Sequence, residues 1–286
     1  MKKIWNWPAV RFLRELVEVY LDKNIPRSAA ALTYFLLLTV FPLVICVNAF
    51  VGLLHLDSAA IFDALSGLIP QSAAALVGDY IGYVSENQSR GMLIAGLVAV
   101  LMSASAALRT VLKAMDEIYE RPAQIGLGRM IFSFVLSLLF LITMYLSIVV
   151  VLTGDWFVHL LETHLPDQLI ALIDFPGLAG LWTWMKYLLL FCFMMLLVLA
   201  LYRVGAPRGG PPRAPVITGA VLASVALVAA SVLFSWFIGI SSRYSLLYGS
   251  LASVIIMMVW LYLCGTILIL GSAFNCVWYR HKLTLE

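Results

Sequence analysis

The chain has 286 residues, of which 63% are hydrophobic and only 12% are charged, and its mean hydropathy is +1.00. Ordinary globular domains are roughly half apolar and a quarter charged, so this composition excludes a soluble protein and predicts an integral membrane protein. The formal net charge of +3 says little as a total, and the positions of Lys and Arg along the chain are more informative.

The N-terminal segment, residues 1–27, is mixed and charged, and it lacks the order of a signal peptide: a basic region, an apolar core and a cleavage site. Leu13, Leu16 and Val17 recur at helical spacing, with Arg and Glu on the other faces. This pattern predicts an amphipathic interfacial helix that lies along the inner leaflet.

Six apolar runs approach or exceed the roughly 20 residues that a helix needs to cross the hydrocarbon core. They cover about 29–54, 91–108, 130–153, 180–203, 214–240 and 246–278. The second run is short, so its helix must extend into the flanking residues, and the sixth is long enough to protrude or tilt. The sequence predicts an all-α integral membrane protein with one six-helix domain over residues 1–286.

The connection between the first two runs, residues 55–90, is apolar for a loop. Ile61 and Leu65, and then Leu76 and Tyr80, repeat at helical spacing on either side of the breaker Pro70. We expect two short amphipathic helices that rest on the outer half of the bundle or dip into it.

Orientation follows from the distribution of basic residues. Nearly all of the 18 Lys and Arg residues precede the first run, join the second to the third or the fourth to the fifth, or follow the sixth, whereas acidic residues dominate the alternate loops. Cytoplasmic loops carry the excess of Lys and Arg, so both termini are predicted to be cytoplasmic in the bacterial inner membrane.

No pattern typical of an active site is present. The sequence has no Walker loop, no G-x-G-x-x-G, no pair of histidines at metal-binding spacing and no carboxylate within a predicted span. The basic residues are scattered among acids without an aromatic platform, which is untypical of nucleic-acid binding. We therefore expect no enzyme activity, metal, cofactor or nucleic-acid partner.

Small and polar residues within the spans serve either helix packing or the lining of an internal cavity. They form one stripe on the second run, Ala95, Ala99, Ser103 and Ala107, and one on the fifth, Gly219, Ala220, Ala223 and Ser224. Asn48, which follows Pro42 in the first run, needs a hydrogen-bond partner, which is either another helix or a cargo headgroup.

Two cations lie toward the outer face. Lys186 is about one turn inside the fourth run, and Arg243 lies in a short turn with Tyr244 and Tyr248. Together they form a candidate site for a phosphate or carboxylate headgroup. Lys186 can instead extend its side chain to the membrane surface, and Arg243 can neutralise an outer acidic residue.

On the inner side, a helix that continues past the second run places Arg109, Lys113 and Asp116 on one face. Contact of Arg109 and Lys113 with anionic lipid of the inner leaflet is the ordinary interpretation of such a face.

Three segments resemble the YihY/BrkB family of bacterial inner-membrane proteins. They are AAALTYFLLLTVFPLVI at 29–45, LRTVLKAMDEIYE at 108–120 and SRYSLLYGSLASVIIMMVWLYLCGTILILGSAFN at 242–275, of which the last is the most specific. The resemblance implies six spans. Members have been labelled ribonucleases or virulence factors, and others are suspected lipid transporters; the residues here do not support the ribonuclease label.

These observations lead to two hypotheses. The first is a transporter or flippase-like protein for an amphipathic anionic envelope molecule, such as a lipid. The alternative is a non-transporting assembly or scaffold protein, with envelope proteins or a second copy of the chain as partner and 55–90 as its docking surface.

Overall fold

The computed structural model describes residues 8–53, 90–122, 127–164, 175–207, 213–240 and 251–283. Seven helices and no strand are present in these ranges. Their bounds are α1 Pro8–Asp22, α2 Ile25–Leu53, α5 Arg90–Ile118, α6 Leu127–His164, α8 Phe175–Gly205, α9 Arg213–Ile240 and α11 Leu251–Leu283. The short helices expected within 55–90 lie outside the described residues.

All helices except α1 are long and apolar enough to cross a membrane, and they number six. This confirms the predicted all-helical fold with six candidate spans. The short second run is extended as expected, because its candidate span continues to Ile118. The orientation of the termini relative to the membrane remains a prediction.

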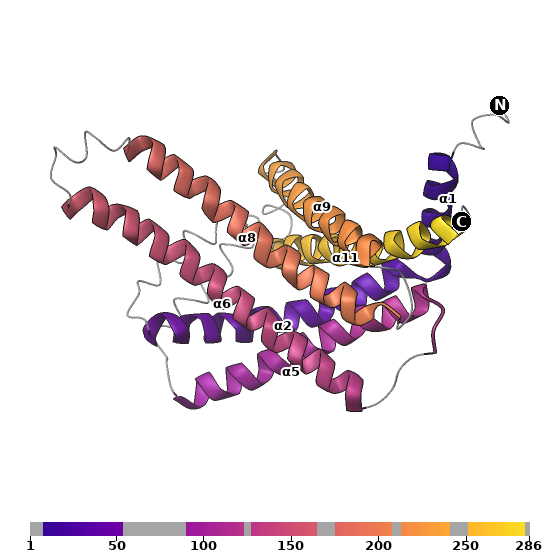
Figure 1. The fold of residues 1–286 in the computed structure, drawn as a ribbon. Helices are drawn as coiled ribbons and strands as arrows, with labels where there is room; N and C mark the ends of the chain where they lie inside the picture. The colour runs from indigo at the N-terminus through magenta and orange to yellow at the C-terminus, as the bar shows by residue number, and fades with distance from the viewer. Residues whose placement is uncertain are drawn as a thin grey trace.

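The start of α2 and the end of α11 lie near α1, so that the described ends of the chain are on one side of the bundle (Figure 1). We refer to this side as the termini end. The ends of α5 and α8 and the starts of α6 and α9 also belong to it, because an even number of spans returns the chain to the side from which it started.

The larger hydrophobic core lies toward the termini end. It joins residues from the starts of α2, α6 and α9 to residues from the ends of α5, α8 and α11, and among its fully buried members are Ile25, Met115, Tyr202 and Ile269. The core residues described further from the termini form two much smaller clusters, around Cys46 and around Met257. In Figure 1, α6 and α8 extend away from α2 and α5 on the side opposite the termini.

Close approach of helix backbones depends on glycine at two places. Gly96 of α5 faces Ile45 of α2, where an added Cβ would lie 2.9 Å from the Ile45 Cγ2. Gly271 of α11 faces α9, where an added Cβ would lie 2.8 Å from the Ala223 Cβ. Small residues at such contacts let helices pack tightly in lipid, where van der Waals contact replaces the hydrophobic effect.

The predicted stripe on α9 is buried as the packing interpretation requires, with Ala220, Ala223 and Ser224 all at most 3% exposed. The stripe on α5 is buried only in part: Ala107 is buried, Ala99 and Ser103 are half-buried, and Ala95 is exposed. The most buried face of this helix also runs through Gly96, Val100 and Ala104. The face that a lipid-embedded helix buries depends on its neighbours, and small size alone does not identify it.

Candidate functional site

Helix α5 ends in a left-handed turn that sets the direction of its charged residues. The Arg121 amide donates to the Asp116 carbonyl at 2.9 Å, and the Glu120 amide donates to the Glu117 carbonyl at 3.3 Å. These bonds define a Schellman helix end, whose left-handed position usually holds glycine. Here it holds Glu120, with φ of 55°, a conformation that costs a residue with a Cβ about 1 kcal/mol or more. The fold thus accepts a strained backbone at a residue whose carboxylate has several partners.

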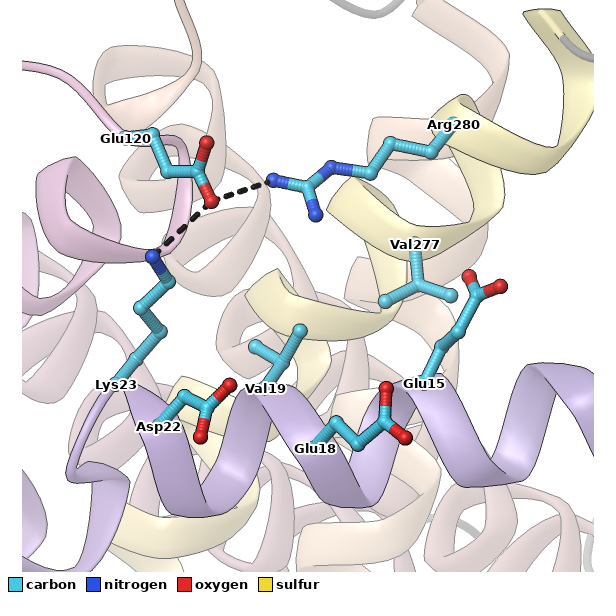
Figure 2. Close-up of a pocket in the computed structure, with 8 residues that line it drawn as sticks. All are labelled: Glu15, Glu18, Val19, Asp22, Lys23, Glu120, Val277 and Arg280. Carbon is cyan, nitrogen blue, oxygen red and sulfur yellow. Dashed lines mark hydrogen bonds and ion pairs between the residues drawn. The ribbon is translucent and has the colours of Figure 1, made fainter.

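The Glu120 carboxylate joins three helices. Its Oε1 lies 3.1 Å from the Lys23 Nζ, at the end of α1, and 3.2 Å from an Arg280 guanidinium nitrogen on α11. Figure 2 shows both cations converging on this oxygen from opposite sides. The hydrogen bond from Lys23 is the main reason that the pKa of Glu120 is lowered, and Arg280 adds to the effect.

A small cleft of about 160 Å³ opens beside this carboxylate. Three acidic residues of α1 line it together with Glu120, two cations and two valines: Glu15, Glu18, Asp22, Lys23, Arg280, Val19 and Val277. The Glu120 side chain is 58% exposed, and exposed ion pairs contribute only about 0.2–1 kcal/mol each. These pairs therefore connect α1, α5 and α11 by interactions that break at little cost.

The second carboxylate of the α5 end is buried. Asp116 is 1% exposed, and its two oxygens pair with different arginines: Oδ1 with Arg121 at 3.2 Å and Oδ2 with Arg129 of α6 at 2.5 Å. Arg121 also donates to the carbonyl of Gly205 at the end of α8. Removing one partner of a buried pair typically costs about 3–5 kcal/mol, so these contacts are a firmer link between α5, α6 and α8.

We call these six residues, Lys23, Asp116, Glu120, Arg121, Arg129 and Arg280, the α5-end cluster. The sequence places Arg109, Lys113 and Asp116 on one helix face, and the predicted lipid contact falls on the two cations of that face. Asp116 and Glu120 join the helices instead. The signal in the sequence was a carboxylate at the expected helix end, without glycine, followed directly by Arg121 and Pro122.

The predicted inner-leaflet residues have different environments. Lys113 is exposed, whereas Arg109 is half-buried and donates to the Ser105 hydroxyl at 2.8 Å. Asp116, expected on the same face, points instead into the bundle toward Arg129. The face is divided because α6 packs against one side of it. Lipid contact by Arg109 and Lys113 remains a prediction.

The predicted outer residues are described only in part. Lys186 lies on α8 and is half-buried, between Met185 and Tyr187, which are both exposed. Asn48 lies within α2, but its side chain is outside the described residues. Arg243, Tyr244 and Tyr248 also lie outside the described residues, so the structure does not test whether Lys186 and Arg243 meet.

A polar group without a partner lies inside the bundle. Both amide atoms of Asn275 on α11 are buried, and neither has a hydrogen-bond partner within the described part of the chain. The Asn275 side chain packs against Gly219 of α9, where there is no room for a Cβ: an added methyl would lie 2.6 Å from Nδ2. The Ser224 hydroxyl, one turn further along α9, is likewise buried and unpartnered among the described residues.

Six apolar helices and a charged cluster at one end of them define a multi-pass helical membrane protein. A family model described as Virulence factor BrkB matches residues 16–285. The chain therefore belongs to the BrkB family, as its resemblance to YihY/BrkB proteins indicated.

The curated relatives carry names of two kinds. The chain is 28% identical over 276 residues to the ribonuclease-like protein YfkH of Bacillus subtilis, an alignment that covers 95% of this chain and 96% of that protein. It is 27% identical over 292 residues to the UPF0761 membrane protein PA0951 of Pseudomonas aeruginosa, covering 96% of this chain and 66% of the relative. The Azotobacter vinelandii UPF0761 membrane protein is 28% identical over 272 residues, covering 93% and 62%.

The chain thus spans about two thirds of the length of these UPF0761 proteins. No solved structure matches the chain. Within the described ranges, no three His, Cys, Asp or Glu side chains are grouped so that they could hold a metal ion.

Proposed function

We propose that the protein is a transporter or flippase-like protein for an amphipathic anionic molecule, such as an envelope lipid, in the bacterial inner membrane. One observation carries the proposal. The described core and the α5-end cluster hold the helices together at the termini end, whereas the core clusters described further from that end are much smaller.

Alternating access requires a bundle in which one end is closed by contacts that can be broken and remade. The α5-end cluster has the right composition for such a closure. The Glu120 pairs are exposed and weak, while the Asp116 pairs are buried and hold α5, α6 and α8 as one group. Opening between α1 and α11 on one side and α5 on the other would break these weak pairs, together with the contact of the Cys276 thiol with the Ile118 carbonyl and part of the shared apolar core.

At the opposite end, large side chains of α8 and α9 are exposed along the helices, with Trp184 at 78% and Trp236 at 67%. Tryptophans near the end of a membrane-spanning helix are typical of the interface between lipid headgroups and acyl chains. In the proposal, Lys186 and Arg243 attract the anionic headgroup near this end, and Tyr244 and Tyr248 bind beside it. Asn48 is the candidate polar contact between them and the closed end.

The test is a lipid-translocation assay in proteoliposomes with tail-labelled fluorescent phosphatidylglycerol, followed by reduction of the outer-leaflet label with dithionite. With the protein present, dithionite should reduce more of the labelled lipid than the half that lies in the outer leaflet. The Lys186→Ala/Arg243→Ala double variant should lower the rate of lipid translocation. Arg203→Ala is the matched control, since Arg203 is an exposed cation of α8 near the other end. Equal reduction with and without protein, for phosphatidylglycerol and for phosphatidylcholine, would exclude lipid translocation.

A further inference from the structure

We propose that Arg121 and Arg129, on either side of Asp116, form a binding site for a phosphate group at the termini end of the bundle. The inference goes beyond the proposed function, because it requires binding only and no movement of the ligand across the membrane.

The charges of Asp116, Arg121 and Arg129 do not cancel. Two guanidinium groups surround one carboxylate, so the group carries one uncompensated positive charge. Exposed fractions of the side chains are 2% for Asp116, 15% for Arg129 and 20% for Arg121, so water screens this charge poorly. A buried charge without a counter-charge is costly, and an anion would remove that cost.

The hydrogen bonds of the same three side chains point to an anion as well. Both Asp116 oxygens form ion pairs, but its Oδ1 has no hydrogen-bond partner among the described residues; the Gly205 carbonyl accepts from Arg121. The Arg121 Nε and the Arg129 Nη2 are nevertheless buried, and neither has a hydrogen-bond partner within the described ranges. Among the described residues, each arginine therefore has one donor without a partner. Planar guanidinium forks match the oxygens of a phosphate, and bonds of this kind are about twice as strong as neutral ones.

Both arginines lie at the ends of membrane-spanning helices. Arg129 is the third residue of α6, at the very start of its candidate span, and Arg121 follows the last residue of the α5 span by three positions. Both arginines thus lie at the level where an apolar helix surface meets the polar end of the bundle. Basic pockets between helices at this level bind phosphate headgroups of anionic lipids. A free phosphate ion presents the same chemistry.

A purely structural role would use the same contacts, with the arginines present only to neutralise Asp116. The two roles differ in their response to Asp116→Asn. This substitution keeps an oxygen that accepts from an arginine but removes the negative charge that competes with a bound anion. If the arginines form a phosphate site, Asp116→Asn should increase the affinity for phosphate. If they only neutralise Asp116, the same substitution should lower the stability of the protein and leave phosphate binding unimproved.

The experiment is native mass spectrometry of the detergent-purified full chain titrated with dioleoylphosphatidylglycerol or dioleoylphosphatidylcholine, with and without inorganic phosphate. We expect Arg129→Gln to weaken phosphatidylglycerol binding at least tenfold, and Asp116→Asn to strengthen it. Arg129→Lys keeps the charge without the fork and should fall between wild type and Arg129→Gln. Arg203→Gln, at an exposed arginine of the same end, should leave binding unchanged.

The phosphate arm separates the two sources. Displacement of the lipid by millimolar inorganic phosphate supports a site that takes free phosphate as well, and lipid retention under phosphate supports a headgroup site. If Arg129→Gln does not fold, Arg129→Lys and Asp116→Asn give the answer. The proposal is overturned if neither of these variants changes phosphatidylglycerol binding from the wild-type value.

Discussion

Substitution of Gly219 by alanine tests the central packing contact of the bundle. An added Cβ at this position would overlap the Asn275 amide group, with Nδ2 2.6 Å away and the other amide atoms closer. Asn275 is 1% exposed, so its side chain would have to move within a packed interior to make room. Forcing a methyl group into a packed interior costs about 1–3 kcal/mol.

The matched control is Gly128→Ala. Gly128 is also helical, and nothing lies within 4 Å of an added Cβ there. Alanine at that site should be neutral or stabilise the helix by up to about 1 kcal/mol. The assay is the midpoint of thermal unfolding in one detergent, measured by the loss of the monodisperse chromatography peak. Gly219→Ala should lower the midpoint by several degrees, because each kcal/mol shifts it by about 2–4 °C in a protein of this size class.

A double variant identifies the clash as the cause. Asn275→Ala removes the overlapping group and also two buried polar atoms that have no partner among the described residues, so Gly219→Ala/Asn275→Ala should be more stable than Gly219→Ala alone. The same Asn275→Ala change combined with Gly128→Ala should add independently, because those sites do not touch. Equal midpoints for Gly219→Ala and Gly128→Ala, or no rescue by Asn275→Ala, would show that Gly219 and Asn275 do not pack as tightly as this contact requires.

Three further substitutions probe the α5-end cluster and the core. Asp116→Ala leaves two poorly exposed guanidinium groups without a counter-charge and should lower the free energy of unfolding by about 3–5 kcal/mol. The control Lys113→Ala, at an exposed neighbour, should change the free energy of unfolding by less than about 0.5 kcal/mol in the same assay. Glu120→Gly relieves the strain of the left-handed backbone but removes the ion pairs that hold α1, so the free energy of unfolding should change by less than about 1 kcal/mol. Amide hydrogen exchange in α1 should accelerate, and an α1 exchange rate equal to that of the wild type would contradict the assigned contacts. Tyr202→Phe deletes the buried hydrogen bond from the phenol to the Leu268 carbonyl, 2.6 Å long, and should cost about 0.5–1.5 kcal/mol by thermal unfolding, with a wild-type midpoint as the contrary result.

The same contacts predict a pH dependence. The pKa of Glu120 is lowered from its ordinary value of 4.5 by Lys23 and Arg280, so its contribution is fully present above that value and is lost as the pH falls through the lowered pKa. Exchange in α1 of the wild type should therefore accelerate below about pH 4.5, and Glu120→Gln should show fast exchange at neutral pH as well. An α1 exchange rate that is independent of pH after correction for intrinsic chemistry would contradict this link.

Much of the architecture could be predicted from the sequence, because the length of an apolar run by itself decides whether a helix can cross a membrane. Six helices of this kind are present, and the family followed from motifs such as the segment at 242–275. The extension of the second helix to Ile118 was also predictable, since 91–108 alone is too short.

The charged cluster was less accessible to sequence reasoning. Asp116 and Lys113 share a face on a helical wheel, yet one is buried and the other exposed, because Arg129 of the next helix neutralises only the first. The contact between Gly219 and Asn275 likewise depends on how two helices pack, which the sequence does not show. Gly219 belongs to the predicted stripe of small residues and Asn275 is the last residue of the segment 242–275, but only the packing of α9 on α11 brings them together.

The most direct test of the proposed transport is to prevent the termini end from opening. Lys23→Cys and Glu120→Cys, in a background without Cys46, Cys192, Cys264 and Cys276, place thiols on the two sides of the weak closure between α1 and α5. A short reducible crosslinker between them should abolish phosphatidylglycerol translocation in proteoliposomes, and reductant should restore it. Translocation at the uncrosslinked rate after complete crosslinking would contradict the account.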